Sequence, residues 1–395
     1  MRATPCIFLR MFVLFPFLAL LFTADPALPR KPQKSFENIG TQADTARTSD
    51  HLDDAITLYS EGVRLRPSWS AGWWWLGSLL YEQDRFSESQ AALQHFVAIA
   101  RDPAPAYAFL GLCEYEMQDY DQAQHHFQLW ARKGWPGTAD LIDVAAFHWA
   151  LLLTRKGRFL EALFLLATEA GKLHNSPALA EAMGLASLRM ANLPEDYPPE
   201  RREMVWLAGE AALNASLPSK EFDRADDYLR RLTLHYGQKP NVHYFRGTIF
   251  TFERKNEEAK AEFQAELQIS PGNVPALLEL ARMDMDSNEL SEAASLAKRA
   301  TEIAPNDADA HHMMGRVLLA TDQFQESARE LEIAEQLAPD SATIRSHLAL
   351  AYRRLGRTEE AKRETAAFLS LKEKEEVMAP PQEKTAVPKQ AGPPK

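Results

Sequence analysis

A spacing of 34 residues recurs along this chain of 395 residues, and it constrains the fold more than any other feature. When the clearest copies are numbered within one repeat, the eighth and the twentieth residues are both small. The eighth residues near the C-terminus are Gly247, Ala281, Gly315 and Ala349. The twentieth residues are Ala259, Ala293, Ser327 and Ala361. Self-similarity at a fixed period of this length is typical of proteins that stack one supersecondary unit many times.

The same frame continues toward the N-terminus, with five extra residues before the third copy. Its eighth residues are Gly77, Gly111 and Ala150, and its twentieth residues are Ser89, Ala123 and Ala162. Proline occupies the thirty-second position in several copies, at Pro271, Pro305 and Pro339. We expect the helix that contains Ala55 and Tyr59 and ends near Pro67 to be the second half of an incomplete first repeat.

Within each copy, apolar residues fall at helical spacing over two stretches of about a dozen residues. Short polar turns such as Gln83-Asp84-Arg85 separate the two stretches. Small residues at the eighth and twentieth positions allow the two helix backbones to approach closely. One helix pair cannot bury its apolar face alone, whereas stacked pairs build a continuous core. The sequence therefore predicts an all-α solenoid of stacked antiparallel helix pairs.

The pattern resembles the tetratricopeptide repeat (TPR) over about residues 52–372. The first-helix signature is matched by Trp73, Leu76, Gly77 and Leu80, and the large second-helix positions by Phe86, Leu93 and Phe96. The resemblance implies a TPR-like α-solenoid whose first helices line a concave groove. It also implies that positions two, five, nine, twelve and thirteen of each repeat face that groove.

The frame breaks once, at Leu193-Pro-Glu-Asp-Tyr-Pro-Pro199, because consecutive prolines cannot continue a helix. We expect new helices over about residues 200–216 and 219–236, and therefore three helices in a segment where four would complete two repeats. The domain organisation that follows has N-terminal repeats over 51–176, an irregular region over 177–239 with a joint near 190–220, and C-terminal repeats over 240–372.

Residues 1–24 have the features of an export signal. Arg2 and Arg10 precede or flank a short apolar run from Met11 to Phe22, and no acidic residue occurs before Asp25. The run is shorter than the roughly 20 residues that cross a bilayer and matches the length of a secretory signal. We expect an exported protein, periplasmic or extracellular, with a membrane anchor at residues 7–22 as the alternative. Residues 25–50 are expected to be a poorly ordered linker, and the Pro-, Lys- and Glu-rich residues 373–395 a disordered tail.

Composition and motifs exclude several functions. The chain has 55 acidic and 44 basic residues and a formal net charge of -11, which argues against nucleic acid as a partner. Its two cysteines, Cys6 and Cys113, provide neither a disulfide framework nor a four-cysteine zinc site. No phosphate-binding glycine loop, zinc-protease histidine pair or nucleophile elbow is present. We therefore predict a non-enzymatic protein with no catalytic residue, cofactor or metal.

Placing the sequence in the frame of the resemblance gives candidate ligand-binding positions. They are Trp74, Tyr81, Tyr115 and Phe147 in the N-terminal half, and Tyr244, Arg282, His312, Arg316, Arg353 and Arg354 in the C-terminal half. Aromatic residues and arginine dominate protein contacts, so the set favours a protein or peptide partner. Two simpler roles remain open at this point. The tryptophans Trp73 to Trp75 could pack in the core, and the arginines could pair with neighbouring glutamates.

Two other functions remain as alternatives. The first is an enzyme accessory that binds a glycan or cell-envelope polymer, which a buried pair of carboxylates in a cleft would favour. The second is a membrane-tethered assembly factor, which would contact the membrane only through an uncleaved N-terminus.

Overall fold

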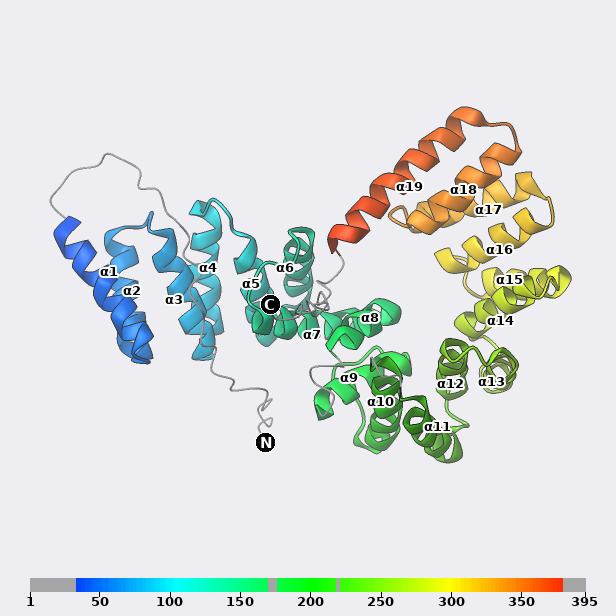
Figure 1. Cartoon of the computed structure of the whole chain (residues 1–395), viewed down its shortest axis with the longest axis horizontal. Helices are drawn as coiled ribbons and strands as arrows, with labels where there is room; N and C mark the ends of the chain where they lie inside the picture. The colour runs from blue at the N-terminus through cyan, green and yellow to red at the C-terminus, as the bar shows by residue number, and fades with distance from the viewer. Residues whose placement is uncertain (1–32, 170–175, 218–220, 379–395) are drawn as a thin grey trace, which may run out of the picture. The chain divides into compact units, whose positions relative to one another are not determined.

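The computed structural model describes residues 33–169, 176–217 and 221–378, and within these ranges the chain folds into α-helices with no strand (Figure 1). The predicted all-α class is confirmed. The chain divides into two compact units, Met1–Trp149 and Ala150–Lys395, which are described separately below. The signal segment, residues 1–24, lies outside the described residues.

The first unit contains α1 (Gln33–Thr48), α2 (Leu52–Leu65), α3 (Ser70–Glu82), α4 (Phe86–Ile99), α5 (Ala104–Glu116), α6 (Tyr120–Arg132) and the first part of α7 (Ala139–Arg155). The rest of α7 belongs to the second unit. That unit continues with α8 (Phe159–Glu169), α9 (Pro177–Ser187), the 3-10 turn η1 (Pro199–Arg201), α10 (Arg202–Ser216) and α11 (Phe222–Tyr236). Its last helices are α12 (Val242–Phe252), α13 (Asn256–Ile269), α14 (Val274–Asp286), α15 (Leu290–Ile303), α16 (Ala308–Ala320), α17 (Phe324–Leu337), α18 (Ala342–Arg354) and α19 (Thr358–Met378).

Consecutive helices pack in pairs, and we call the members of each pair the first and second helix of a repeat. The pairs are α1 with α2, α3 with α4 and α5 with α6 in the first unit. In the second unit they are α12 with α13, α14 with α15, α16 with α17 and α18 with α19. First helices of neighbouring repeats also touch, since α3 contacts α5, and α16 contacts both α14 and α18. The predicted stacking of helix pairs is confirmed within each unit.

The small residue at position eight leaves room for a large side chain of the second helix. A methyl group added at Gly77 would lie 2.6 Å from Leu93, and one at Gly315 would lie 2.5 Å from Leu331. Gly111 faces the Phe127 ring in the same way. At position twenty, the buried Ser327 hydroxyl donates a hydrogen bond of 2.7 Å to the carbonyl of Gly315, twelve residues earlier. The two small positions therefore set the distance between the paired helices.

A sharp turn joins the two helices of each pair, and its residue at position fifteen of the repeat has a left-handed backbone. Examples are Asp84 (φ 57°), Arg254 (φ 62°) and Gly356 (φ 74°). The amide of the next residue then bonds back over five residues, as from Glu289 to the carbonyl of Asp284 at 2.7 Å. This arrangement is a Schellman motif, which bonds carbonyls that the end of a helix would otherwise leave without a donor.

The first repeat is complete, so the prediction of a poorly ordered linker at residues 25–50 is wrong for α1. This helix packs on α2, and both Ala43 and Ala55 are fully buried. Ala43 lies 34 residues before Gly77 and occupies position eight, and Asp50 provides the left-handed turn residue (φ 60°). Close packing against α2 orders a segment whose polar composition alone indicates a linker.

The C-terminal boundary also differs from the prediction, because α19 continues through residues 373–378, which were assigned to the tail. Lys and Glu are good helix formers, which favours a helix over these residues. The remainder of the predicted tail, residues 379–395, lies outside the described residues.

The irregular joint is present, and residues 177–239 contain three α-helices, as predicted. Its basis is direct backbone contact between α9 and α10. A methyl group added at Gly184 would lie 2.0 Å from the carbonyl oxygen of Val205, and one at Gly209 would lie 1.7 Å from that of Ala180. The connection between the two helices runs through residues 188–198, where Leu193 is fully buried. In this pair, backbone contact replaces the contact between a small residue and a large side chain.

Replacing Gly184 with Ala should destabilise the second unit by about 3 kcal/mol, because neither backbone can yield without shifting a helix. Gly272→Ala is the matched control, since its added methyl group would lie 3.9 Å from the nearest atom, on Ile303. The control should stay within about 0.5 kcal/mol of wild type. Chemical denaturation followed by circular dichroism measures both. Equal stability of the two variants would contradict the proposed contact.

Candidate functional site

The candidate residues lie on first helices, where a fixed contact joins neighbouring repeats. Position five of one repeat meets position six of the next: Trp74 meets Phe109, Leu278 packs in the cluster of Met313, and His312 meets His347. The backbone geometry is shared while the chemistry changes from aromatic to aliphatic to imidazole. The aromatic candidates Trp74, Tyr81, Tyr115 and Phe147 lie in the first unit, and the other candidates lie in the second.

In the first unit, Trp74 and Tyr81 both pack on the Phe109 ring of the next repeat. The ring centroids are 5.6 Å and 5.4 Å apart, and both contacts are edge-to-face. Trp74 also lies 5.4 Å from Phe96, and Tyr81 lies 5.6 Å from Phe86. Both candidates are half-buried, and burial raises the pKa of the Tyr81 hydroxyl. Much of each ring therefore contributes to packing between repeats.

Tyr115 and Phe147 continue the aromatic set. Tyr115 lies 4.7 Å from the His148 ring and 5.5 Å from the Tyr120 ring. Phe147 is half-buried and lies beside His148, with centroids 5.6 Å apart. Burial lowers the pKa of His148, while its hydrogen bond to the Val144 carbonyl opposes that shift. None of the aromatic candidates is therefore an isolated exposed ring. Trp74 and Tyr81 share the neighbour Phe109, and Tyr115 and Phe147 share the neighbour His148.

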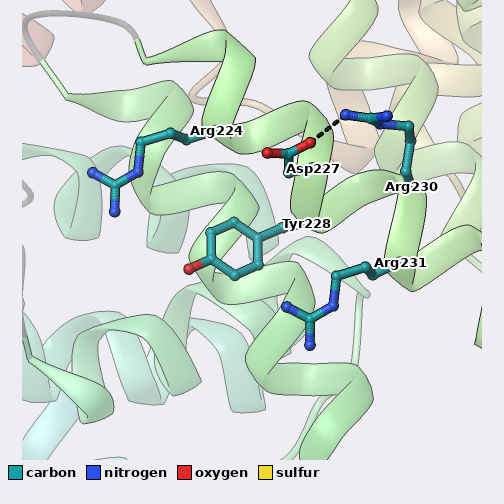
Figure 2. A pocket seen from close by; sticks show the side chains of 5 residues that line it. All are labelled: Arg224, Asp227, Tyr228, Arg230 and Arg231. Atoms are coloured by element: carbon teal, nitrogen blue, oxygen red, sulfur yellow. Dashed lines mark hydrogen bonds and ion pairs between the residues drawn. The ribbon is translucent and has the colours of Figure 1, made fainter.

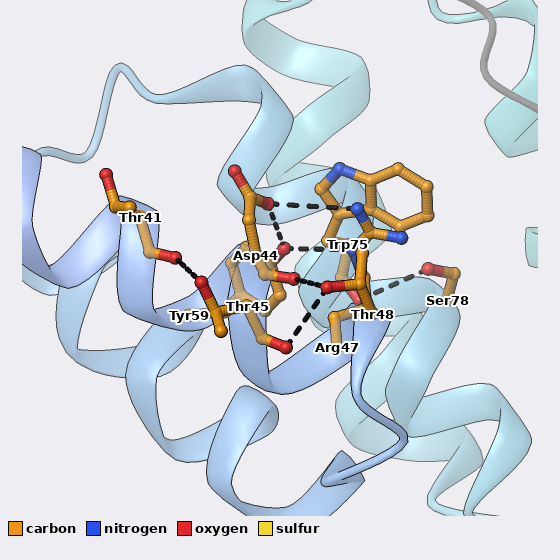
Figure 3. A network of polar contacts seen from close by, with 8 residues as sticks. All are labelled: Thr41, Asp44, Thr45, Arg47, Thr48, Tyr59, Trp75 and Ser78. Atoms are coloured by element: carbon orange, nitrogen blue, oxygen red, sulfur yellow. Dashed lines mark hydrogen bonds and ion pairs between the residues drawn. The ribbon is translucent and has the colours of Figure 1, made fainter.

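Trp73 and Trp75, whose role the sequence left open, both pack against neighbouring side chains. The Trp73 ring stacks on His95 at 4.4 Å, and its indole nitrogen donates to the carbonyl of Pro67 at 2.9 Å. The Arg47 guanidinium lies 3.8 Å from the centre of the Trp75 ring (Figure 3). Arg47 also donates to the hydroxyl of Tyr59, which joins α1, α2 and α3.

In the second unit, Tyr244 belongs to the hydrophobic core and is only 8% exposed. Its ring packs 5.8 Å from Phe263, and burial raises the pKa of its hydroxyl. Little of this side chain is available to a ligand. Arg282 is engaged as well, because it bonds to Glu279 at 2.9 Å and to Asp286 at 3.1 Å on its own helix.

Three arginine candidates differ from Arg282 because they form no ion pair with any described residue. Arg316 is half-buried, and its closest polar contact is the sulfur of Met313 at 3.9 Å. Arg353 is exposed at the end of α18. Arg354 is also exposed and lies 5.7 Å from the centre of the Phe324 ring. These guanidinium groups retain donors that a carboxylate could accept.

His312 faces the His347 ring across the repeat boundary. Its Nε2 atom lies 3.0 Å from the Nδ1 atom of His347, which in turn lies 2.9 Å from the carbonyl of Thr343. Burial, together with the neighbouring His347 and Arg316, lowers the pKa of His312 to about 3. The adjacent His311 has a different role, because it bonds to Glu330 at 2.6 Å and to the carbonyl of Pro305 at 3.0 Å.

Sequence reasoning missed two side chains of the second unit that resemble the candidates. Phe252 is 70% exposed at position thirteen of its repeat, and counting five residues from Gly247 would have found it. Arg189 follows α9 with a left-handed backbone and lies over the rings of Phe159 at 4.8 Å and Tyr244 at 5.7 Å. Gly184 lies 34 residues after Ala150, so Arg189 is also at position thirteen and the same count would have found it.

A separate hollow of about 450 Å³ lies along α11, lined by Arg224, Asp227, Tyr228, Arg230 and Arg231 (Figure 2). Arg224 pairs with Glu221 at 2.8 Å, and Arg230 pairs with Asp226 and Asp227. Most of its positive charge is therefore neutralised on the same helix. The hollow is a weaker candidate for an anionic ligand than the arginines of α16 and α18.

The most deeply buried carboxylates of the described residues have structural partners. Glu266 accepts the backbone amide of Asn241 at 2.8 Å, and Glu114 bonds to Nδ1 of His126 at 2.7 Å. Asp284 lies 2.8 Å from the ammonium group of Lys260. In the described ranges, no group of three or more His, Cys, Asp and Glu side chains could hold a metal ion. None of the described helices is both long and apolar enough to span a membrane.

The architecture defines an α-solenoid built from helix pairs, and the sequence comparisons identify its family. Family models described as tetratricopeptide repeat match residues 41–108, 253–317 and 312–366. The protein belongs to the tetratricopeptide repeat family. The first match begins inside α1, in agreement with a complete first repeat. Such repeats form extended surfaces that bind other proteins.

Similar solved structures include "MamA 41-end from Desulfovibrio magneticus RS-1", with 16% identity and a TM-score of 0.38. The match covers 43% of this chain and 96% of that one. Another is YrrB, described as "a TPR protein with an unusual peptide-binding site", with 18% identity and a TM-score of 0.36 over 45% of this chain and 92% of that one. No curated protein matches the chain in sequence.

The lowered pKa of His312 predicts a pH-dependent stability. Below the ordinary histidine pKa of 6.5, the unfolded chain takes up a proton that folded His312 does not. The free energy of unfolding should therefore fall as the pH drops from about 6.5 toward about 3, by up to about 1.4 kcal/mol per pH unit. His312→Gln removes this contribution, so its stability should fall less between about pH 7 and about pH 5.

Denaturation at both pH values measures the difference between His312→Gln and wild type. His235→Gln is the control, because it removes an exposed imidazole from α11. A wild-type chain whose loss of stability matches that of His312→Gln would contradict the prediction.

Proposed function

We propose that this protein is an exported, non-enzymatic scaffold that binds another polypeptide in the groove of its first helices. One observation carries the proposal: Arg316, Arg353 and Arg354 lack a carboxylate partner among the described residues. All three lie on α16 and α18, at positions that the resemblance assigns to the groove. Carboxylates outnumber basic groups in this chain, 55 to 44. Arginines that pair with no carboxylate of the described residues are therefore suited to bind carboxylates of a partner.

The aromatic set supports the same proposal from the other unit. Trp74, Tyr81 and Tyr115 lie on first helices and stay half-buried, so part of each ring remains accessible. Aromatic rings and arginines are the residues that dominate binding energy at protein interfaces. The partner is a protein or peptide, in line with the interaction surfaces that such repeats provide. The acidic net charge of -11 disfavours nucleic acid.

The proposal includes neither catalysis nor a cofactor. The alternative of a glycan- or envelope polymer-binding enzyme accessory depends on a buried pair of carboxylates. Glu114, Glu266 and Asp284 each have a different kind of partner, namely a histidine, backbone amides and a lysine. They therefore give this alternative no support.

The double substitution Arg353→Gln with Arg354→Gln should weaken binding of the partner without changing the melting temperature. Both side chains are exposed, so the fold does not depend on them. We expect a loss of about fivefold in affinity, and wild-type affinity should fall as salt is added. A pull-down with the mature chain, followed by mass spectrometry, identifies the partner, and calorimetry measures its affinity.

Lys362→Gln with Arg363→Gln is the matched control, because it removes two exposed basic groups from α19, the second helix of the same repeat. This control should bind like wild type. Equal affinity of the Arg353/Arg354 variant and the control would exclude these arginines from the binding surface. Failure of the wild-type chain to capture any polypeptide would exclude the proposed function.

Export is tested separately, on the native protein. N-terminal sequencing should show that about the first 24 residues are absent, because a basic start and a short apolar run are features of a cleaved signal. An intact start with retention in the membrane fraction would support the tethered assembly factor instead.

A further inference from the structure

Three basic groups of neighbouring repeats meet on the first helices α16 and α18. His312 and Arg316 lie one turn apart on α16, and His347 on α18 bonds to His312 at 3.0 Å. All three side chains are half-buried. His347 is not one of the residues that sequence reasoning selected, since position six was not among the inward positions. We call His312, His347 and Arg316 the imidazole–arginine cluster.

The hydrogen bonds fix the protons of the two rings. The carbonyl of Thr343 can only accept, so the Nδ1 atom of His347, 2.9 Å away, carries the hydrogen. With the hydrogen on Nδ1 of His347, the Nε2 atom of His312 at 3.0 Å can only accept, which leaves the hydrogen of a neutral His312 on its Nδ1 atom. Both rings are neutral in this arrangement, and the only full charge of the cluster is that of Arg316. The N–H of His312 and the guanidinium remain as donors.

The elements around the cluster provide no carboxylate to it. On α17, Glu330 is bonded to His311, and on α18, Arg345 is bonded to Glu335 and Glu364. On α14, Arg282 holds both Glu279 and Asp286. The apolar side chains of Leu278 and Met285 on α14 pack against the core cluster that contains Met313 of α16. These carboxylates are therefore paired elsewhere, and the charged or titratable groups that act on His312 are His347 and Arg316. Asp309, one turn before His312 on α16, forms no ion pair with a described residue, and burial raises the pKa of its carboxyl.

We propose that the imidazole–arginine cluster binds a carboxylate of an acidic polypeptide segment, and that binding is coupled to proton uptake by the two histidines. The proposal rests on the proposed function and names the chemistry of the partner. Arg316 provides the permanent charge, and an entering carboxylate accepts N–H groups that have no other acceptor. A helix or strand rich in Lys or Arg would meet three basic groups and be rejected.

The direction of the pH dependence follows from linkage. In the free protein, burial and the neighbouring cations lower the pKa of both His312 and His347. A bound carboxylate favours the charged imidazole, so it raises these pKa values. The complex then holds more protons than the free protein, and affinity for an acidic segment must increase as the pH falls. An acidic segment bound by arginine alone would show no such increase, because neither its carboxylates nor arginine titrate near neutral pH.

A fluorescein-labelled peptide of eight glutamates tests the proposal by fluorescence anisotropy with the full chain at low salt, with a peptide of eight serines as the reference. Wild type should bind the glutamate peptide, and its affinity should increase at least about threefold between about pH 7.5 and about pH 5.5. Arg316→Gln should weaken binding about tenfold. His347→Gln should flatten the pH dependence, because it removes one titrating ring.

Arg329→Gln is the matched control, since it removes an exposed arginine from α17, the second helix of the same repeat as Arg316. It should bind like wild type, and circular dichroism at each pH verifies that every variant is folded. The proposal is overturned if Arg316→Gln and Arg329→Gln bind the glutamate peptide equally, or if wild-type affinity does not increase at the lower pH. A polypeptide partner that binds Arg316→Gln as tightly as wild type overturns this inference alone. The absence of any polypeptide partner overturns the proposed function itself.

Discussion

The close approach of paired helices at position eight is the contact on which the array depends. Gly77, Gly111 and Gly315 have no side chain, so a large residue of the second helix lies directly over their backbones. Because this distance recurs, the turn at position fifteen recurs with the same left-handed backbone. A larger residue at position eight would push the second helix away and change every contact that follows in that repeat. Regular stacking of neighbouring repeats then follows from one repeated steric constraint.

Regular stacking gives equivalent positions the same neighbours, and this is how the fold builds a surface without specifying its chemistry. Position five faces position six of the next repeat in pairs as different as Trp74 with Phe109 and His312 with His347. The aromatic pair uses the contact to exclude water and stabilise the stack. The imidazole pair uses it to bring titratable groups next to Arg316. One geometry thus supports either packing or recognition, depending on two residues.

The sequence predicted the repeat class because small residues at a fixed spacing report a backbone distance directly. It also located the joint, because consecutive prolines cannot continue a helix. It failed at α1, where Ala43 occupies position eight but polar composition hides the helix. It could not separate Arg282 from Arg316 either, because whether a guanidinium has a partner depends on side-chain positions rather than on its place in the frame. The first failure could be avoided by extending the frame one period, whereas the second could not.

The two candidate sets differ in what the fold requires of them. The rings of Trp74 and Tyr81 are held by Phe109, so packing between repeats accounts for much of their presence. Packing does not account for Arg316 beside two imidazoles, because a half-buried cation among basic neighbours is unfavourable for stability. An aliphatic pair such as Leu278 with Met313 occupies the same positions without that penalty. Arg316 beside two imidazoles weakens the stack at a position where the fold accepts a neutral pair, and binding is the best explanation for it. The arginines of α16 and α18 are therefore the stronger part of the functional proposal.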